Sequence, residues 1–111
     1  MAQKEIETII EELKAETKAR FVGLFDYEGS AIAASGDNAG HTGKDFIFEI
    51  RHQTEGDTLM ITRGGVYCRR YRIWFRSNHV LGVLVSDKTD VGPVRDKARA
   101  AVAKLKPMLG G

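Results

Sequence analysis

Two nearly unbroken apolar segments place the strongest constraint on what this chain can fold into. The first, Phe21–Phe25, reads FVGLF, and the second, Val80–Val85, reads VLGVLV. A strand with one buried face alternates apolar and polar residues, whereas a strand that is buried on both faces reads as a continuous apolar run. The two segments therefore predict strands in the middle of a sheet that is covered on both faces.

Amphipathic helices are predicted at both ends of the chain. In residues 3–18 the apolar side chains share one helical face, which consists of Ile6, Ile9, Ile10 and Leu13. Residues 91–109 show the same spacing, and Pro93 suits a first turn because it has no N–H to leave unpaired. Asp90 or Thr89 can cap this second helix.

The remaining segments predict three weaker strands and one ambiguous element. Ala31–Ser35 follows a turn with Glu28-Gly29 at its tip, and Thr58–Arg63 and 66–76 lead through a meander to the second apolar run. Residues 44–53 carry a short helical stripe that includes Phe46 and Ile50, although their FIFEI sequence also suits a strand. We interpret residues 44–53 as a helix.

This order of elements predicts a single α+β domain over residues 1–111. With sequence neighbours paired, the sheet is antiparallel and five-stranded, with the strand order 2-1-5-4-3. The two terminal helices are expected on one face of the sheet and the middle helix on the other. The strand Thr58–Arg63 then forms an open edge, which either pairs with a strand of another chain or is a risk for aggregation.

Composition limits the function classes. The chain has 111 residues, of which 42% are hydrophobic and 29% charged, and its net charge of +2 is too small to predict nucleic-acid binding by itself. The single Cys68 excludes an internal disulfide framework and a cysteine-based zinc site. The charged, amphipathic start is unlike a signal peptide, and the apolar runs are too short to cross a membrane. We expect a cytoplasmic protein.

No constellation of residues predicts an enzyme. Cys68 has no neighbouring histidine and lies in a predicted strand, where a lone cysteine usually acts as a small hydrophobe. The spacing of His41 and His52 matches no metal-ligand motif, and His79 stands apart from both. The GDNAG and RGG segments form neither a Walker loop nor a dinucleotide-binding loop. We expect no catalytic residue, no metal and no cofactor.

A basic and aromatic strip is the main candidate for a binding surface. Alternation along 66–76 places Arg70, Arg72, Trp74 and Arg76 on one face of the strand. Arginine and tryptophan are frequent anchors of protein interfaces, but such side chains also lie over a neighbouring helix with their polar ends in water. We disfavour nucleic-acid binding and leave protein contact and simple packing as equal alternatives. Arg51 would extend the strip.

The chain resembles the Roadblock family of dynein light chains, in particular its bacterial MglB-like members. The resemblance covers nearly the whole chain, from FVGLFDYEGSAIAASG to RYRIWFRSNHVLGVLVSDKTDVGPVRDKARAAVAKL. In the second stretch an apolar strand leads through Asp and small residues into a basic, apolar helix. The chain departs from the family in Gly36–Gln53, which is shorter and richer in glycine.

The resemblance implies a homodimer that acts as a non-catalytic platform for a Ras-like small GTPase and has no nucleotide site of its own. Third strands would pair across a two-fold axis, with the middle helices side by side. The residues implied at the dimer interface are Phe46, Ile50, Thr58, Met60 and Thr62. Candidates for partner contact are Arg51, Arg70, Arg72 and Trp74. We expect stimulation of hydrolysis by positioning of the GTPase's own groups, with a donated arginine as the alternative.

Two other functions compete with this hypothesis. One is a structural or assembly module of the same fold without a GTPase partner. The other is a small ligand-sensing domain of profilin-like or PAS-like architecture, which would need a buried polar cavity between the sheet and the middle helix. The sequence shows no convergent polar set for such a cavity.

Overall fold

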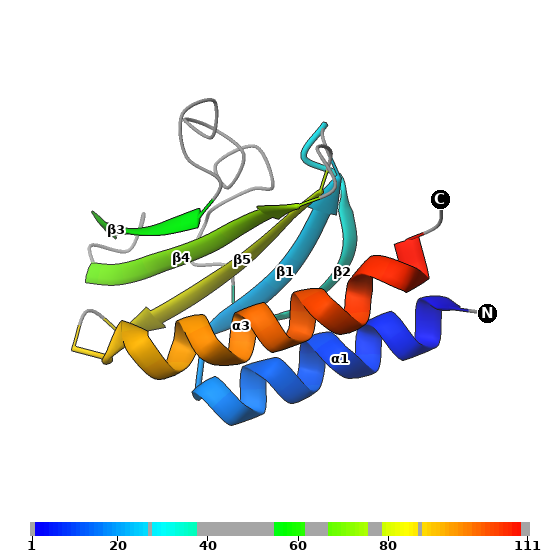
Figure 1. Cartoon of the computed structure of the whole chain (residues 1–111). Helices are drawn as coiled ribbons and strands as arrows, with labels where there is room; N and C mark the ends of the chain where they lie inside the picture. The colour runs from blue at the N-terminus through cyan, green and yellow to red at the C-terminus, as the bar shows by residue number, and fades with distance from the viewer. Residues whose placement is uncertain are drawn as a thin grey trace.

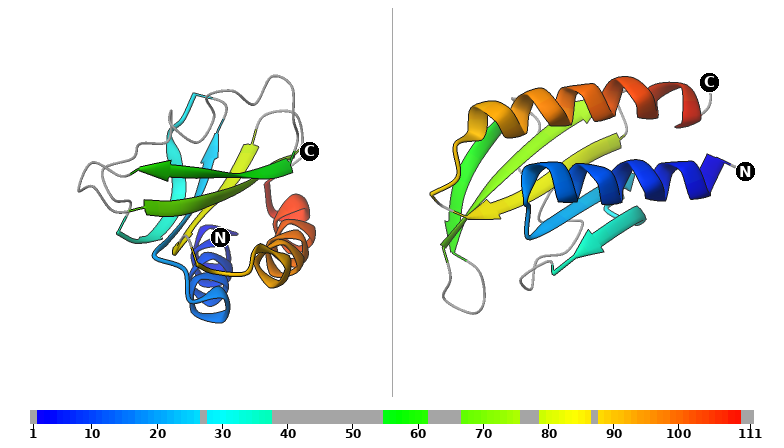
Figure 2. Two further views of the ribbon diagram at one scale, coloured as in Figure 1. Left: turned by 90° about the vertical axis from the view of Figure 1, so that its left-hand side faces the viewer. Right: turned by 90° about the horizontal axis from the view of Figure 1, so that it is seen from below.

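The chain forms an antiparallel β-sheet with two α-helices on one of its faces (Figures 1 and 2). The computed structural model describes residues 2–26, 28–37, 55–61, 67–75, 79–86 and 88–109, and it describes β3 and β4 by their backbones. The elements are α1 (Ala2–Thr17), β1 (Phe21–Asp26), β2 (Ala31–Gly36), β3 (Glu55–Ile61), β4 (Tyr67–Phe75), β5 (His79–Ser86), α3 (Val91–Leu105) and the 3₁₀ helix η2 (Lys106–Leu109). The predicted α+β class is confirmed. The helix predicted over 44–53 lies outside the described residues.

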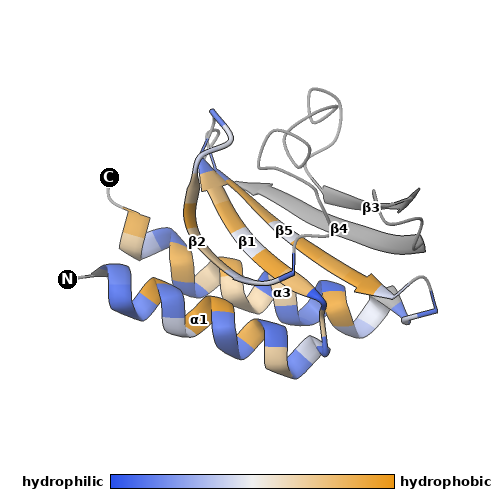
Figure 3. Ribbon diagram, turned by 180° about the vertical axis from the view of Figure 1, so that it is seen from behind, coloured by the Kyte–Doolittle hydropathy of each residue, from blue (hydrophilic) through white to orange (hydrophobic). Residues whose placement is uncertain are grey.

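The strands are hydrogen-bonded in the order β2-β1-β5-β4-β3, so β1 and β5 lie inside the sheet. They pair in an unshifted register that runs from Phe21 opposite Leu84 to Asp26 opposite His79. Their continuous apolar sequences make them the most hydrophobic of the strands coloured by hydropathy in Figure 3. Val22, Leu24 and their neighbours on β5 are fully buried, as the sequence predicts for inner strands.

The main core lies between the sheet and the two helices, which run antiparallel side by side (Figure 1). α1 packs against β1 and β2, while α3 packs against α1 and β4. The helices contribute the residues that the 3.6-residue spacing predicts, namely Ile6, Ile10 and Leu13 from α1 and Val94, Ala98, Ala101, Val102 and Leu105 from α3. The strands contribute alternate residues, namely Val22 and Leu24 from β1 and Leu81, Val83 and Val85 from β5.

Local hydrogen bonds set the end of α1 and the start of α3. α1 ends in a Schellman-type arrangement, in which Lys18 adopts a φ of 54° and the Ala19 N–H donates to the Lys14 carbonyl at 3.1 Å. α3 begins at Asp90, whose carboxylate accepts from the Gly92 N–H at 3.1 Å. Of the two caps predicted from sequence, Asp90 is therefore the one used.

Two predicted boundaries were wrong by three residues or more. The apolar stripe of the last helix predicts α-helix as far as Leu109, but α3 ends at Leu105 and continues as η2. Pro107 lies in η2, and proline both lacks an N–H and clashes with the carbonyl four residues earlier in an α-helix. The third strand begins at Glu55 and not at Thr58, because Glu55, Gly56 and Asp57 continue the ladder with β4.

Candidate interaction surface

The strand order leaves β3 at one end of the sheet and β2 at the other. β3 pairs with β4 over seven consecutive positions, from Glu55 opposite Ile73 to Ile61 opposite Tyr67. A regular strand at the end of a sheet presents backbone N–H and C=O groups along one side, and these groups are a template for another strand. β3 is therefore the first candidate for contact with a second chain.

Two of the five residues predicted at a dimer interface lie on β3. The backbone register pairs Thr58 with Arg70 and Met60 with Cys68. Because residues two positions apart on a strand point to the same face, Thr58 and Met60 share a face with their partners Arg70 and Cys68. The other three, Phe46, Ile50 and Thr62, lie outside the described residues. Nothing in the described part of the chain tests the role of these five residues as an interface.

Three of the four predicted partner-contact residues lie on β4 and share one face of the sheet. Arg70, Arg72 and Trp74 pair with Leu84, Gly82 and Val80 of β5, respectively. Leu84 and Val80 are fully buried but are absent from the core beneath the helices. This register places the three β4 positions on the face opposite α1 and α3, together with Thr58. Arg51 lies outside the described residues.

A row that is glycine or alanine on every strand except β4 crosses this second face, and sequence reasoning missed it. Reading across the five strands, the register aligns Gly56, Arg72, Gly82, Gly23 and Ala34. The Arg72 position therefore has glycine as its direct neighbour on both adjacent strands. The signal in the sequence was a glycine inside each apolar run, which marks close approach of another group to the strand.

The missing side chain at Gly23 leaves room for two aromatic rings on the same strand. The rings of Phe21 and Phe25 stack with centroids 6.3 Å apart, and a Cβ at Gly23 would lie 2.5 Å from Cζ of Phe25 and 2.8 Å from Cε2 of Phe21. Both rings are at most 5% exposed. The glycine thus allows two aromatic side chains to close over the strand, and the second face carries buried apolar residues beside the β4 arginine positions.

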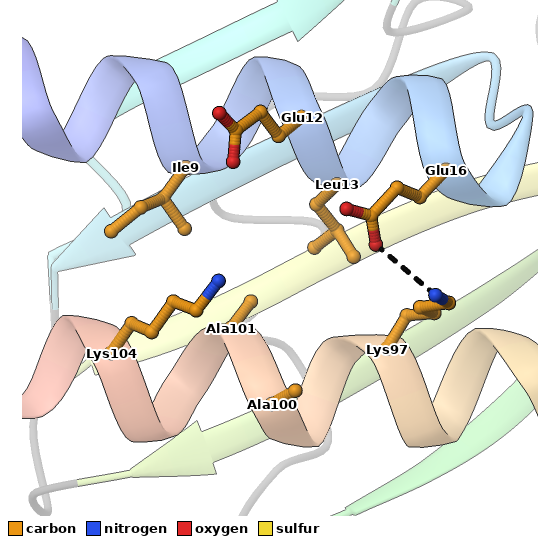
Figure 4. Close-up of a pocket in the computed structure, with 8 residues that line it drawn as sticks. All are labelled: Ile9, Glu12, Leu13, Glu16, Lys97, Ala100, Ala101 and Lys104. Carbon is orange, nitrogen blue, oxygen red and sulfur yellow. Dashed lines mark ion pairs between the residues drawn. The ribbon is translucent and has the colours of Figure 1, made fainter.

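A groove between α1 and α3 lies on the helix-covered side of the sheet (Figure 4). Its floor is apolar and includes Leu13 and Ala101, and its walls carry opposite charges. Glu16 of α1 and Lys97 of α3 form an ion pair across it, with Oε2 and Nζ 3.4 Å apart. The groove holds no nucleophile beside a base, so it offers helix packing and no visible chemistry.

The residues considered for chemistry are dispersed. Cys68 of β4 is paired with Ser86 of β5, and His79 stands at the start of β5 opposite Asp26. His41 and His52 lie outside the described residues. Within the described ranges, no three histidine, cysteine or acidic side chains converge on a possible metal site. None of the helices in those ranges has the length and apolarity that crossing a bilayer requires.

Solved structures with the same architecture include MglB proteins and Roadblock/LC7 domains. MglB of Myxococcus xanthus is 18% identical, has a TM-score of 0.75, and the match covers 96% of this chain and 89% of that chain. A structure described as MglB with tetrameric arrangement is 16% identical, with a TM-score of 0.70 and coverage of 95% and 88%. A Roadblock/LC7 domain from Streptomyces avermitilis is 13% identical, with a TM-score of 0.67 and coverage of 93% and 96%.

These matches confirm the resemblance to MglB-like Roadblock/LC7 proteins at the level of the fold. No family model matches the sequence, and no curated protein matches it either. The fold is therefore visible in three dimensions at sequence identities of 18% and below.

Proposed function

We propose that this chain, which has the fold of MglB and other Roadblock/LC7 domains, is a non-enzymatic homodimeric adaptor that binds and regulates a Ras-like small GTPase. The observation that carries the proposal is the likeness to MglB over 96% of the chain. The position of β3 at one end of the strand order supports pairing between two copies. A relative that is described as tetrameric shows that an MglB protein of this fold associates with itself.

In the proposed dimer, the β3 strands of two copies pair across a two-fold axis and extend one sheet through both subunits. A two-fold axis is the commonest symmetry of soluble homo-oligomers and makes the same residues of both copies meet. Thr58 and Met60 would line the contact from β3, with Thr62 beyond the described end of the strand. Residues 44–53 would form the middle helix on the second face, where Phe46 and Ile50 of the two copies meet.

The GTPase would bind on the second face, opposite α1 and α3. The β4 positions Arg70, Arg72 and Trp74 support this choice, because they share that face with Thr58 of β3, the strand proposed to pair between the two copies. Guanidinium groups bind carboxylates and phosphates in two-pronged geometry, and tryptophan adds contact area. Arg51 would extend the surface. The adaptor would act in the cytoplasm and would position the switch regions of its partner without a nucleotide site of its own.

Binding and turnover measured together separate positioning from a donated arginine. We would capture GTP-loaded GTPases from native lysate on the immobilised chain, and then measure binding and GTP hydrolysis with the captured protein. Arg70→Ala and Arg72→Ala are expected to weaken binding, whereas the control Arg95→Ala, on the exposed face of α3, is expected to leave it unchanged. Loss of turnover with intact binding would instead identify an arginine that stabilises transition-state charge.

Failure to capture any GTPase, with self-association intact, would favour the second function, an assembly module of the same fold. The tetrameric arrangement described for an MglB relative is the observation that supports this alternative. The cavity that a ligand-sensing domain would need, between the sheet and residues 44–53, falls outside the described residues, so that alternative stays a prediction.

A further inference from the structure

The β2 edge of the sheet contains an irregularity at Ile32. In the ladder between β1 and β2, Leu24 pairs with Ala33, but the next residue, Phe25, pairs with Ala31. Ile32 is therefore the extra residue of a β-bulge and has no partner of its own on β1. A bulge bends the strand that carries it and increases its twist, so β2 departs from a straight edge at this point.

A side chain from α1 donates a hydrogen bond to the backbone carbonyl at the bulge. Nε2 of Gln3 donates to the Ile32 carbonyl oxygen at 2.7 Å, across 29 residues of sequence. The same nitrogen lies 3.2 Å from Oε1 of Glu7, one helical turn further along α1. A primary amide nitrogen carries two hydrogens, so these two contacts use both. Glu7 thus holds the Gln3 amide against β2 and adds a negative charge beside that edge.

The two ends of the sheet differ in what they offer to another strand. Sheet edges are protected by bulges, by charges and by covering elements, because an open row of backbone groups recruits further strands. β2 has a bulge, a side-chain hydrogen bond on its carbonyl, an acidic neighbour and a helix packed against it. β3 pairs with β4 in a ladder of seven residues without a register shift.

We propose that the Ile32 bulge and Gln3 close the β2 edge to strand pairing, so that the sheet grows only through β3 and stops at two copies. The inference rests on the proposed pairing of β3 strands. If β3 pairs with β3, each dimer has a β2 strand at both outer ends. An open β2 edge would then pair with β2 of the next dimer and extend the assembly without limit. In this role Gln3 keeps the β2 edge from pairing with another copy, and Glu7 holds the Gln3 side chain in position.

The test is the solution mass of variants that straighten or uncover β2, measured by light scattering over a concentration series. Deletion of Ile32 preserves the observed pairs on both sides of the bulge and makes the ladder regular. Combined with Gln3→Ala, it is expected to give a mass that exceeds that of the wild type and rises with concentration. The matched control Ile32→Ala, which keeps the bulge and removes the apolar contact, is expected to keep the wild-type mass.

A folded double variant with the wild-type mass at every concentration would overturn the proposal. If the deletion prevents folding, as judged by circular dichroism, the pair Gln3→Ala and Glu7→Ala decides the question, because both residues are exposed. Growth of that variant supports a closed β2 edge, and an unchanged mass contradicts the role of Gln3 in closing it. If the wild type is monomeric, only the proposed pairing of β3 strands is refuted. The variants that open β2 would then still be expected to form dimers through β2.

Discussion

The two faces of the sheet are built from the same strands but differ in how their side chains pack. On the face beneath α1 and α3, alternate strand residues such as Leu24 and Val83 join the helices in one close-packed core. On the other face, the register aligns glycines beside the Arg72 position, and two phenylalanine rings close over Gly23. The comparison shows one face closed by the two helices, and a second face whose apolar residues are equally buried and lie beside the β4 positions proposed for partner contact.

The largest expected effect tests the packed face. Leu24 is fully buried in the core beneath the helices, so Leu24→Ala removes apolar contacts and leaves a cavity. We expect the free energy of unfolding to fall by about 2–5 kcal/mol, measured by urea unfolding. Ile9→Ala, at a half-buried position on the rim of the same core, is the control and should cost less. Equal losses at the two positions would contradict a close-packed core centred on Leu24.

The next effect tests the second face. Gly23→Ala places a methyl group 2.5 Å from Cζ of Phe25, so the two buried rings must shift. Overpacking of this kind lowers the free energy of unfolding by about 1–3 kcal/mol. Gly92→Ala is the matched control, since the nearest atom to its added Cβ is Oδ1 of Asp90 at 3.5 Å. If thermal unfolding shows both substitutions to be neutral, the rings do not close over Gly23 as described.

A smaller effect concerns the start of α3, which holds one side of the packed face. Asp90→Ala removes the acceptor for the Gly92 N–H and should cost about 1 kcal/mol of stability. Asp90→Asn keeps an acceptor oxygen and should restore most of the loss in the same urea titration. A full loss in the asparagine variant would show that the charge, and not the cap hydrogen bond, stabilises the helix.

The smallest effect is expected at the ion pair on the outer surface of the helices. The side chains of Glu16 and Lys97 are about half exposed, at 51% and 52%, so water screens their attraction. A double-mutant cycle with Glu16→Gln and Lys97→Met should give a coupling of at most about 0.5 kcal/mol, and added salt should remove it. A large coupling that resists salt would place this pair among the determinants of helix packing.

The sequence predicts well those elements whose pattern of apolar residues follows directly from burial. The apolar runs of β1 and β5 and the helical stripes of α1 and α3 appear where periodicity places them, because burial dictates residue type at each position. The bulge at Ile32 and the glycine row through Gly82 are pairing relationships between strands, and a single strand's sequence does not encode its register with the next. The start of β3 was misplaced for the same reason, since Gly56 and Asp57 are poor strand formers that a neighbouring strand holds in the ladder.

The candidate site follows the same division. Alternation along β4 was sufficient to place Arg70, Arg72 and Trp74 on one face, and the register with β5 adds that this face lies opposite the helices. Which of these residues contacts a partner depends on the surface of that partner, and no pattern within one chain encodes it. The functional prediction therefore depends on resemblance, and the residues supply its tests.

The most direct test of the central claim is the solution mass of the purified chain compared with a variant at the β3 edge. One chain has a mass of 12.3 kDa, and light scattering after size exclusion should find twice this value for the wild type. Met60→Lys places like charges near each other across the proposed two-fold axis and should return the mass to that of one chain, while Thr8→Lys on the exposed surface of α1 should leave the dimer intact. A wild type that remains monomeric at high concentration, or a Met60→Lys variant that remains dimeric, would contradict pairing through β3.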